Sequence, residues 1–279
     1  MRFSGNIITS RQNPLAVTLC KLDDRKTRKV LGLFRFDGVK LFCEAILKGI
    51  EIEKIIIKES VCEKVISRAD EILGADVSSS ELEYTLFSDE LFDRVCEENA
   101  PDGIICIAKV PKNIHGEACL ADGGALCVGE GERIILLESV RDPKNVGAII
   151  RSAVAFGIDR LIISRDCADL YNQKAVRGSM GTLFGIRIDR VDNISLAVSA
   201  LRAQGRRVFA SALDERARAL GEVTLGDRDC VLIGNEGHGL TQQAIASCDE
   251  KLYIPMSAGA ESLNAAVAAS VFMWEMRKR

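Results

Sequence analysis

The sequence predicts an α/β protein in which a small α/β domain precedes a larger domain built on a parallel sheet. From about residue 132 onward, short and almost wholly apolar segments alternate with helical patterns, as they do when helices cover both faces of a parallel sheet. A glycine-rich stretch separates this region from residues 1–110. Only 5% of the residues are aromatic, so the cores are expected to consist mainly of Val, Ile, Leu and Ala.

Residues 1–110 are expected to form the smaller domain. The patterns predict helices over 15–31, 39–48 and 89–97, and strands over 52–58 and 103–110. In residues 1–40, nine basic residues outnumber three acidic ones, which suits either a phosphate-bearing partner or a solvated helix face. Residues 111–131 contain Pro111 and five glycines, and this composition predicts a linker.

Residues 132–279 are expected to form the parallel-sheet domain. The strand candidates are 134–138, 160–164, 185–188, 207–210, 230–233 and 251–254. The helix candidates are 146–156, 171–177, 194–204, 241–247 and 262–277. Ligands of such sheets bind at the carboxyl ends of the strands, so polar residues that directly follow a strand are the candidates for function.

Cysteine spacing and hydropathy exclude several classes of protein. The ten cysteines include no C-x-x-C pair and the two histidines complete no zinc pattern, so no metal is expected. No signal-peptide pattern or long apolar span is present, so we expect the protein to make no membrane contact and to reside in a reducing cytoplasm. The net charge of −3 leaves RNA binding open, because local patches matter more than the total.

The first candidate segment runs from Glu138 to Gly157 and begins where a strand ends. Asp142 or Asn145 can cap the helix that follows, with Pro143 setting the turn, and a well-capped helix is an equally good explanation of this element alone. Arg151 lies among apolar residues on that helix. A buried arginine needs a carboxylate or a phosphate, so we expect Arg151 to have such a partner.

The second segment, I-G-N-E-G-H-G-L at 233–240, follows an apolar strand. Gly234 and Gly237 permit a close backbone approach to a ligand, and Glu236 between them has no packing role. The spacing matches neither the dinucleotide nor the P-loop fingerprint, which weakens a nucleotide-binding interpretation. Taken alone, a plain glycine turn explains the segment equally well.

The third segment comprises Y-I-P-M at 253–256 and E-S-L-N-A-A at 261–266. We expect Ser262 to be the N-cap of the last helix and Leu263 to pack inward, while Asn264 has no folding role in the first turn. Each segment by itself has a structural explanation. Three such segments in this order are much more specific.

In this order and spacing, the segments resemble the motifs of the SpoU (TrmH) family of RNA ribose 2′-O-methyltransferases, part of the SPOUT superfamily. The match consists of D-P-x-N-x-G with Arg151, G-x-E-G-x-G-L running on to I-P-M, and S-L-N at 262–264. Residues 177–181 (R-G-S-M-G) are close to the family's R-x-S-x-G. Residues 8–22, and F-D-G at 36–38 where V-E-G is more usual, resemble the L30e-like RNA-binding domain of larger members.

This resemblance implies an S-adenosylmethionine cofactor, a C-terminal trefoil knot and a homodimer with sites built across its interface. It also implies which residues contact the cofactor: Gly234, Gly237, Ile254, Met256 and Leu263. The expected partner is RNA. Ribosomal RNA, 23S in particular, is favoured over transfer RNA, because family members that act on transfer RNA often lack the N-terminal domain.

The resemblance further implies the catalytic residues: Arg151, Asn145, Glu236, Ser262 and Asn264. A guanidinium stays protonated, so we expect Arg151 to bind a phosphate and stabilise the developing alkoxide, while the other four orient Arg151 and the ribose. One alternative is a non-catalytic RNA-binding protein on the same fold, and the presence of all five residues argues against it. A phosphate-binding α/β enzyme is a second alternative, but it would be expected to have a lysine near the glycine turn.

Overall fold

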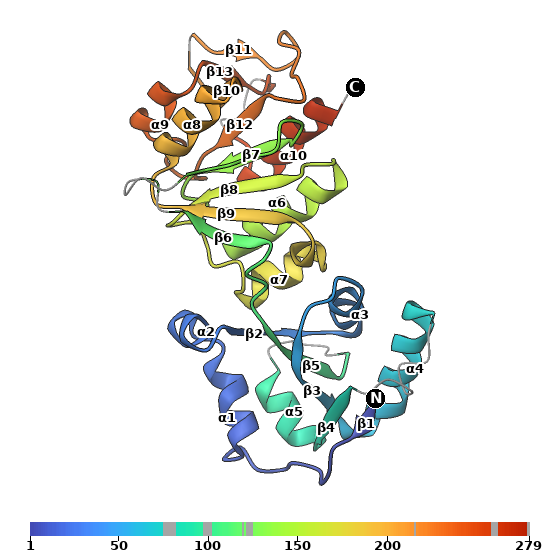
Figure 1. Cartoon of the computed structure of the whole chain (residues 1–279). Helices are drawn as coiled ribbons and strands as arrows, with labels where there is room; N and C mark the ends of the chain where they lie inside the picture. Colours follow the sequence, from blue (N-terminus) through green and yellow to red (C-terminus); the bar gives the residue numbers. More distant parts are fainter. Residues whose placement is uncertain are drawn as a thin grey trace. The chain divides into compact units, whose positions relative to one another are not determined.

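The computed structural model confirms the predicted α/β class and describes residues 1–74, 82–96, 102–118, 120, 125–214, 216–257 and 262–277 (Figure 1). The chain forms two compact units. Unit 1 comprises Met1–Pro111 and Tyr171–Gly185, and unit 2 comprises Lys112–Leu170 and Ile186–Arg279. Glu97 at the end of one predicted helix, Glu261 of the third segment, and linker residues 119 and 121–124 lie outside the described residues.

Unit 1 is built on a five-stranded mixed sheet of order β1-β4-β3-β5-β2. The strands are β1 (Arg2–Phe3), β2 (Leu33–Asp37), β3 (Ile52–Lys58), β4 (Glu83–Phe87) and β5 (Ile104–Lys109). Strands β1, β4 and β3 run parallel, and β5 is antiparallel to both β3 and β2. Strands β3 and β5 match the predicted ones, whereas β1, β2 and β4 were not predicted.

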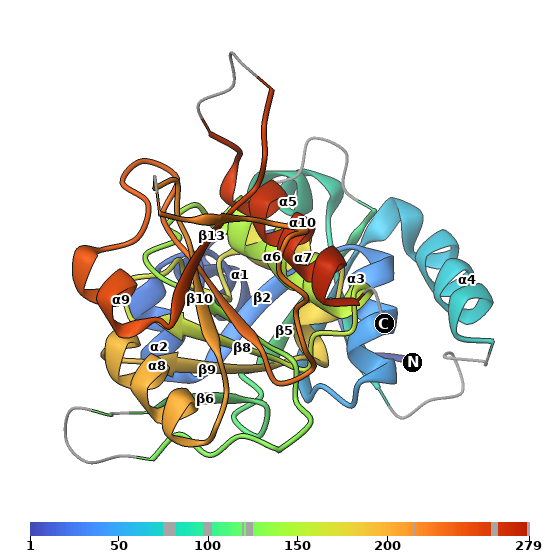
Figure 2. The same cartoon turned by 90° about the horizontal axis from the view of Figure 1, so that it is seen from above.

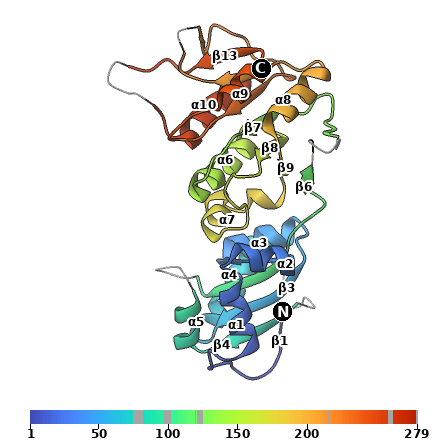
Figure 3. The same ribbon diagram turned by 90° about the vertical axis from the view of Figure 1, so that its left-hand side faces the viewer.

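Helices cover the sheet of unit 1. They are α1 (Pro14–Lys21), α2 (Arg25–Leu31), α3 (Val39–Leu47), α4 (Cys62–Leu73) and α5 (Asp89–Val95). Helices α1 and α5 lie side by side, with Leu19 and Phe92 in one core with Ile56 of β3 (Figure 3). The single helix predicted over 15–31 is two helices, because Asp24 accepts a hydrogen bond from Thr27 N at 2.8 Å and begins α2.

Helix α7 (Gln173–Ser179) belongs to unit 1, although its sequence falls between two strands of unit 2. The Tyr171 ring lies 4.8 Å from the ring of Phe34 on β2. Gln173 Nε2 donates to Asp23 Oδ1 at 2.6 Å. Aromatic packing and this buried amide thus attach residues 171–185 to the N-terminal sheet, which the pattern of alternating strands and helices does not reveal.

Unit 2 contains an eight-stranded sheet of order β11-β13-β10-β12-β7-β8-β9-β6, with every neighbouring pair parallel. The strands are β6 (His115–Ala118), β7 (Ile134–Leu137), β8 (Arg160–Ser164), β9 (Arg187–Val191), β10 (Val208–Ser211), β11 (Arg218–Ala219), β12 (Cys230–Ile233) and β13 (Glu250–Tyr253). Residues 111–131, expected as a linker, thus also supply the edge strand β6, which pairs with β9.

Four helices flank this sheet, with α8 (Ile194–Ala203) and α9 (Gln242–Ser247) on one face and α6 (Pro143–Ala155) and α10 (Ala265–Arg277) on the other (Figure 2). Side chains alternate along each strand, so Ile134 and Leu136 enter the core beneath α8. Strands β7 and β12 lie centrally, with β8 and β9 on one side and β10 and β13 on the other. The order of strands reverses there, which is where ligands of such sheets bind. Among the described residues, no helix is long and apolar enough to cross a membrane.

Candidate active site

The first predicted segment forms the entry to helix α6. Asp142 is the N-cap, with its Oδ1 accepting a hydrogen bond from Lys144 N at 2.8 Å, and Pro143 is the first helical residue. Of the two cap candidates, Asp142 therefore fills the role. This leaves the side chain of Asn145, only 9% exposed, for another partner.

Asn145 connects all three predicted segments. Its Nδ2 donates to Glu236 Oε1, and its Oδ1 accepts from Asn264 Nδ2 at 3.0 Å. We call Glu236, Asn145 and Asn264 the polar relay. Glu236 and Asn264 follow Asn145 by 91 and 119 positions in the sequence, so only the fold brings the three together. A buried amide that both donates and accepts holds its two neighbours in fixed orientations.

Asn264 also caps helix α10. Its Oδ1 accepts hydrogen bonds from Ala266 N at 2.9 Å and Val267 N at 3.4 Å, and the helix begins at Ala265. The prediction that Ser262 is the N-cap was therefore wrong, as was the prediction that Asn264 has no folding role. Asparagine is as good an N-cap as serine, and a sequence offering both in three residues does not decide between them.

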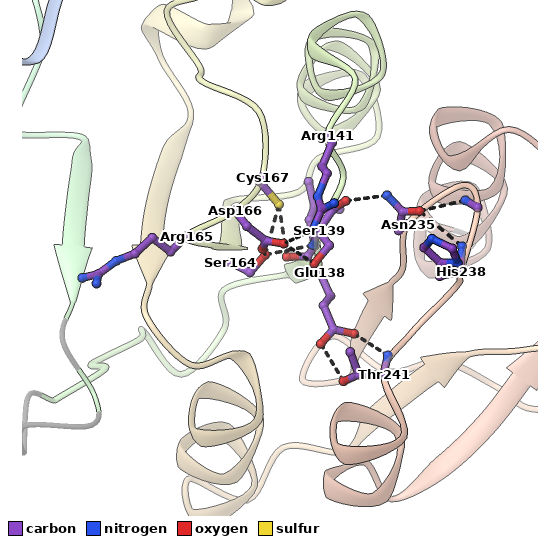
Figure 4. A network of polar contacts seen from close by, with 12 residues as sticks. Glu138, Ser139, Arg141, Ser164, Arg165, Asp166, Cys167, Asn235, His238 and Thr241 are labelled. Carbon is purple, nitrogen blue, oxygen red and sulfur yellow. Dashed lines mark hydrogen bonds and ion pairs between the residues drawn. The ribbon is translucent and has the colours of Figure 1, made fainter. Parts of the chain in front are cut away.

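Asn235, which the sequence did not single out, organises the glycine turn. Its Oδ1 accepts from Gly237 N at 2.8 Å and His238 N at 3.3 Å, and its backbone exchanges two hydrogen bonds with Gly239. Its Nδ2 donates to Ser139 O, at 2.7 Å, beyond the end of β7 (Figure 4). Asparagine commonly bonds to backbone groups two residues ahead, so an asparagine beside glycines was the available signal.

Gly234 is required by the close approach of the chain to itself. A β-carbon at this position would lie 2.5 Å from the carbonyl carbon of Gly239 and 2.6 Å from Leu240 N. Gly239 has a φ of 66°, in the left-handed region that favours glycine. These glycines therefore close the 235–239 turn tightly above the end of β12.

The turn forms one wall of a cleft of about 520 Å³ at the carboxyl ends of β10, β12 and β13. Its lining includes all five predicted cofactor contacts, namely Gly234, Gly237, Ile254, Met256 and Leu263. Glu236 and Ser262 also line it. Apolar residues such as Ile233 and Phe272 form much of the remainder. A volume of several hundred Å³, with polar groups placed among apolar side chains, suits a small-molecule site.

Arg151 does not lie where its sequence context suggested. It is exposed, so the expected burial of Arg151 was wrong. No described residue supplies a carboxylate partner, and a phosphate partner stays a prediction. Val154 on the same helix is 43% exposed, which shows that α6 is not buried all round. Arg151 follows Asn145 by six residues, which places it about 120° around the helix from the polar relay.

Glu138, at the end of β7, is a buried acid that was not among the predicted site residues. Its Oε2 accepts from Thr241 N at 2.9 Å and its Oε1 from Thr241 Oγ1 at 2.8 Å (Figure 4). Thr241 in turn caps α9. An acid that ends an apolar strand and is 6% exposed needs such partners, and here they tie β7 to the helix that follows the turn.

Two other expectations concern residues that do not line the cleft. The R-G-S-M-G residues at 177–181 belong to unit 1, where Met180 has a φ of 52° and caps α7. Within the described residues, no group of three or more His, Cys, Asp or Glu side chains is arranged to hold a metal ion.

Comparison with known proteins identifies the family. Residues 132–274, just over half of the chain, match the SpoU rRNA Methylase family, and residues 13–106 match the MRM3-like substrate binding domain. The chain belongs to the SpoU rRNA Methylase family. This confirms the family predicted from the three segments.

Relatives of this SpoU-family protein match it over nearly its full length. A 23S rRNA (guanosine(2553)-2′-O)-methyltransferase, RlmP of Bacillus subtilis, is 27% identical over 97% of this chain and 98% of its own. A 23S rRNA (uridine(2479)-2′-O)-methyltransferase of Streptomyces viridochromogenes is 30% identical over 96% and 90%. The solved structure of an AdoMet-bound rRNA methyltransferase from Sinorhizobium meliloti superposes with a TM-score of 0.78, at 26% identity over 98% and 97% of the two chains.

Proposed function

We propose that this protein transfers a methyl group from S-adenosylmethionine to a ribose 2′-hydroxyl in RNA, with 23S ribosomal RNA as the substrate. The observation that carries the proposal is the polar relay, which joins the three family segments beside the cleft. The full-length relatives that carry 23S rRNA 2′-O-methyltransferase names support the substrate. Cytoplasmic action follows from that substrate.

The cleft residues fit the proposed cofactor. Gly234 has no side chain, so a ligand can approach its backbone closely. Ile254, Met256 and Leu263 offer apolar contacts to an adenine ring. When bound, S-adenosylmethionine supplies an electrophilic methyl group on a sulfonium sulfur. Asn235 holds the turn 235–239 in place, so the wall of the site is formed before the cofactor enters. Such preorganisation lowers the entropic cost of binding.

The polar relay positions the acceptor ribose. Asn145 Nδ2 donates to Glu236 Oε1. Glu236 lines the cleft, and its Oε2 accepts no hydrogen bond from another described residue. Ser262, exposed at the same cleft, offers a hydroxyl. We expect these groups to orient the 2′-hydroxyl, because positioning two reactants accounts for much of the rate enhancement in such transfers.

Arg151 would act in the cleft of a second copy of this chain. It is exposed and lies about 120° around α6 from Asn145. Beside it, an apolar face on α6 and α10 exposes Val154, Val267 and Trp274 at 43–49% and includes a hollow of about 440 Å³. Residues of this kind and exposure suit a homodimer interface. The guanidinium would bind the phosphate next to the target ribose and stabilise the alkoxide.

Unit 1 would hold the RNA. Its match to the MRM3-like substrate binding domain and the basic excess of residues 1–40 both support this role. Arg25 and Lys26 on α2 are exposed and available to phosphates. We also propose that unit 2 carries the C-terminal trefoil knot expected of the family, with the tight contact of Gly234 against Gly239 and Leu240 as part of its packing.

The test is to map ribose methylation. Ribosomal RNA from cells with and without the gene is compared for 2′-O-methyl sites, and the purified protein is incubated with the unmodified RNA and labelled S-adenosylmethionine. We expect one 23S site to be lost without the gene and restored in vitro. Methylation of transfer RNA alone would overturn the substrate, and the absence of any methylated RNA would favour a non-catalytic RNA-binding protein.

A further inference from the structure

Ser139 adopts a backbone conformation that its side chain disfavours. It follows Glu138 at the end of β7 and has a φ of 56°. Among the described residues, Met180 is the only other non-glycine residue with positive φ. A left-handed backbone conformation costs a serine free energy, and it persists only where the surroundings hold it.

Three long-range hydrogen bonds hold Ser139. Its N–H donates to Ser164 Oγ at 2.9 Å, and its hydroxyl donates to Asp166 Oδ2 at 2.6 Å. Its carbonyl accepts from Asn235 Nδ2 at 2.7 Å. Ser139 thus links the loop after β8 to the 235–239 turn, and Figure 4 shows it between the two.

Asp166 is the anchor of this link. Its Oδ1 accepts from Ser164 Oγ at 2.6 Å, and its Oδ2 also accepts from Arg141 Nη2 at 3.1 Å. Burial would raise the pKa of Asp166, but the hydrogen bonds from Ser139, Ser164 and Arg141 outweigh it and hold the pKa below its ordinary value. The carboxylate is therefore charged at neutral pH and accepts strong, charge-assisted hydrogen bonds.

Hydrogen bonds from Arg190 hold the loop that carries Asp166. The Arg190 guanidinium donates to the carbonyls of Ser164, Arg165, Cys167 and Ala168 at 3.0–3.3 Å. A residue on such a loop has little freedom to follow its partners. Asp166 therefore fixes Ser139, rather than the reverse.

We propose that Asp166 is a positioning residue for the methyl-donor cleft. It lines no part of the cleft. It acts by holding Ser139 in its left-handed conformation, so that the Ser139 carbonyl fixes the amide of Asn235 and with it the wall formed by the 235–239 turn. This inference rests on the proposed function of the cleft, because its readout is the affinity for S-adenosylmethionine.

The test measures binding of S-adenosylmethionine to the full-length protein by calorimetry. Asp166→Ala should raise the Kd about tenfold, the order expected when one charge-assisted hydrogen bond no longer organises a site. The matched control is Asp159→Ala. Asp159 precedes β8 as Asp166 follows it, and its Oδ2 accepts from Arg133 N at 2.8 Å at the opposite edge of the sheet. We expect that variant to bind as the wild type does.

Variants of Ser139 test whether Asp166 acts through it. Ser139→Ala keeps a β-carbon at positive φ and loses the hydroxyl, so it should weaken binding more than Ser139→Gly, in which that φ is unstrained. Asp166→Ala added to Ser139→Gly should cost less than it does alone, because the link is already cut. The comparison of Ser139→Ala with Ser139→Gly contains no change at Asp166, so it remains decisive should Asp166→Ala fail to fold.

Each outcome bears on the inference. Wild-type affinity in Asp166→Ala or Ser139→Ala would overturn it, as would strict additivity in the double variant. An equal loss in Asp159→Ala would also overturn it, since the effect would then be one of general stability. A wild-type protein that binds no S-adenosylmethionine would instead overturn the proposed function itself.

Discussion

The two edges of the parallel sheet in unit 2 both bury polar side chains, but they use them differently. At the amino edge, Arg160 is 1% exposed and donates to Asp189 at 2.8 Å and Glu132 at 3.0 Å. Arg206, 4% exposed, donates to the carbonyls of residues 129, 130 and 132. These guanidiniums bond to groups on neighbouring segments, and neither arginine lines the cleft at the carboxyl edge.

At the carboxyl edge, the polar relay borders the 520 Å³ cleft. Asn145 is buried, whereas Glu236 and Asn264 are exposed, and Glu236 lines the cleft. Gly234 and Gly239 bring the backbone close to itself there. The comparison teaches that burial of a charged group marks structure as readily as function, and that an adjacent cleft with partly satisfied groups distinguishes the two.

The largest expected effect is at the amino edge. Arg160→Ala leaves Glu132 and Asp189 without their common partner, and breaking a buried ion pair in this way costs about 3–5 kcal/mol of folding free energy. Urea denaturation would measure the loss. The affinity of the folded fraction for S-adenosylmethionine should be unchanged, and a stable Arg160→Ala protein with a damaged cleft would contradict the division between edges.

Arg151→Ala should leave stability intact and lower the methyl-transfer rate about a hundredfold or more, the scale of losing one group that stabilises a developing charge. The residue is exposed, so its removal empties no core. Transfer from labelled S-adenosylmethionine and calorimetric Kd would be measured together, with Lys144→Ala on the same helix as control. Near wild-type turnover in Arg151→Lys would contradict bidentate orientation of the phosphate.

Gly234→Ala should weaken S-adenosylmethionine binding about tenfold or more, with a smaller loss of stability. Its β-carbon would lie 2.5 Å from the Gly239 carbonyl carbon, so the 235–239 turn must move. Gly131→Ala is the control, because a β-carbon there meets nothing within 4 Å. Equal affinity in Gly234→Ala and wild type would mean that this turn is not a wall of the cofactor site.

The smallest expected effect separates the two roles of Asn264. Asn264→Ala should lower stability by about 1 kcal/mol through loss of the N-cap, whereas Asn264→Asp keeps a capping oxygen and should stay close to the wild type in thermal melting. Both variants lose the donor to Asn145, so both should turn over slowly. If Asn264→Asp were fully active, the relay would not contribute to catalysis.

Much of the fold follows from patterns that are local in sequence. Strand β3 and strands β7, β8, β10 and β12 of unit 2 come from short, mainly apolar runs. Asp142 and Pro143 set the start of α6 within one turn. The three family segments lie where strands end, so their common edge could also be predicted. Strands β2 and β4 were not predicted from the sequence because charged and polar residues interrupt their apolar runs.

The composition of the cleft was thus accessible from the sequence alone, because glycine turns and strand ends depend on short-range backbone chemistry. The tertiary structure decided which polar residues meet. It paired Asn145 with partners 91 and 119 residues away and joined Asp166 to the 235–239 turn through Ser139. It also exposed Arg151, which the sequence had predicted to be buried. The physical reason is that hydrogen bonds between side chains depend on position and direction in space, and a one-dimensional pattern carries neither for residues distant in sequence.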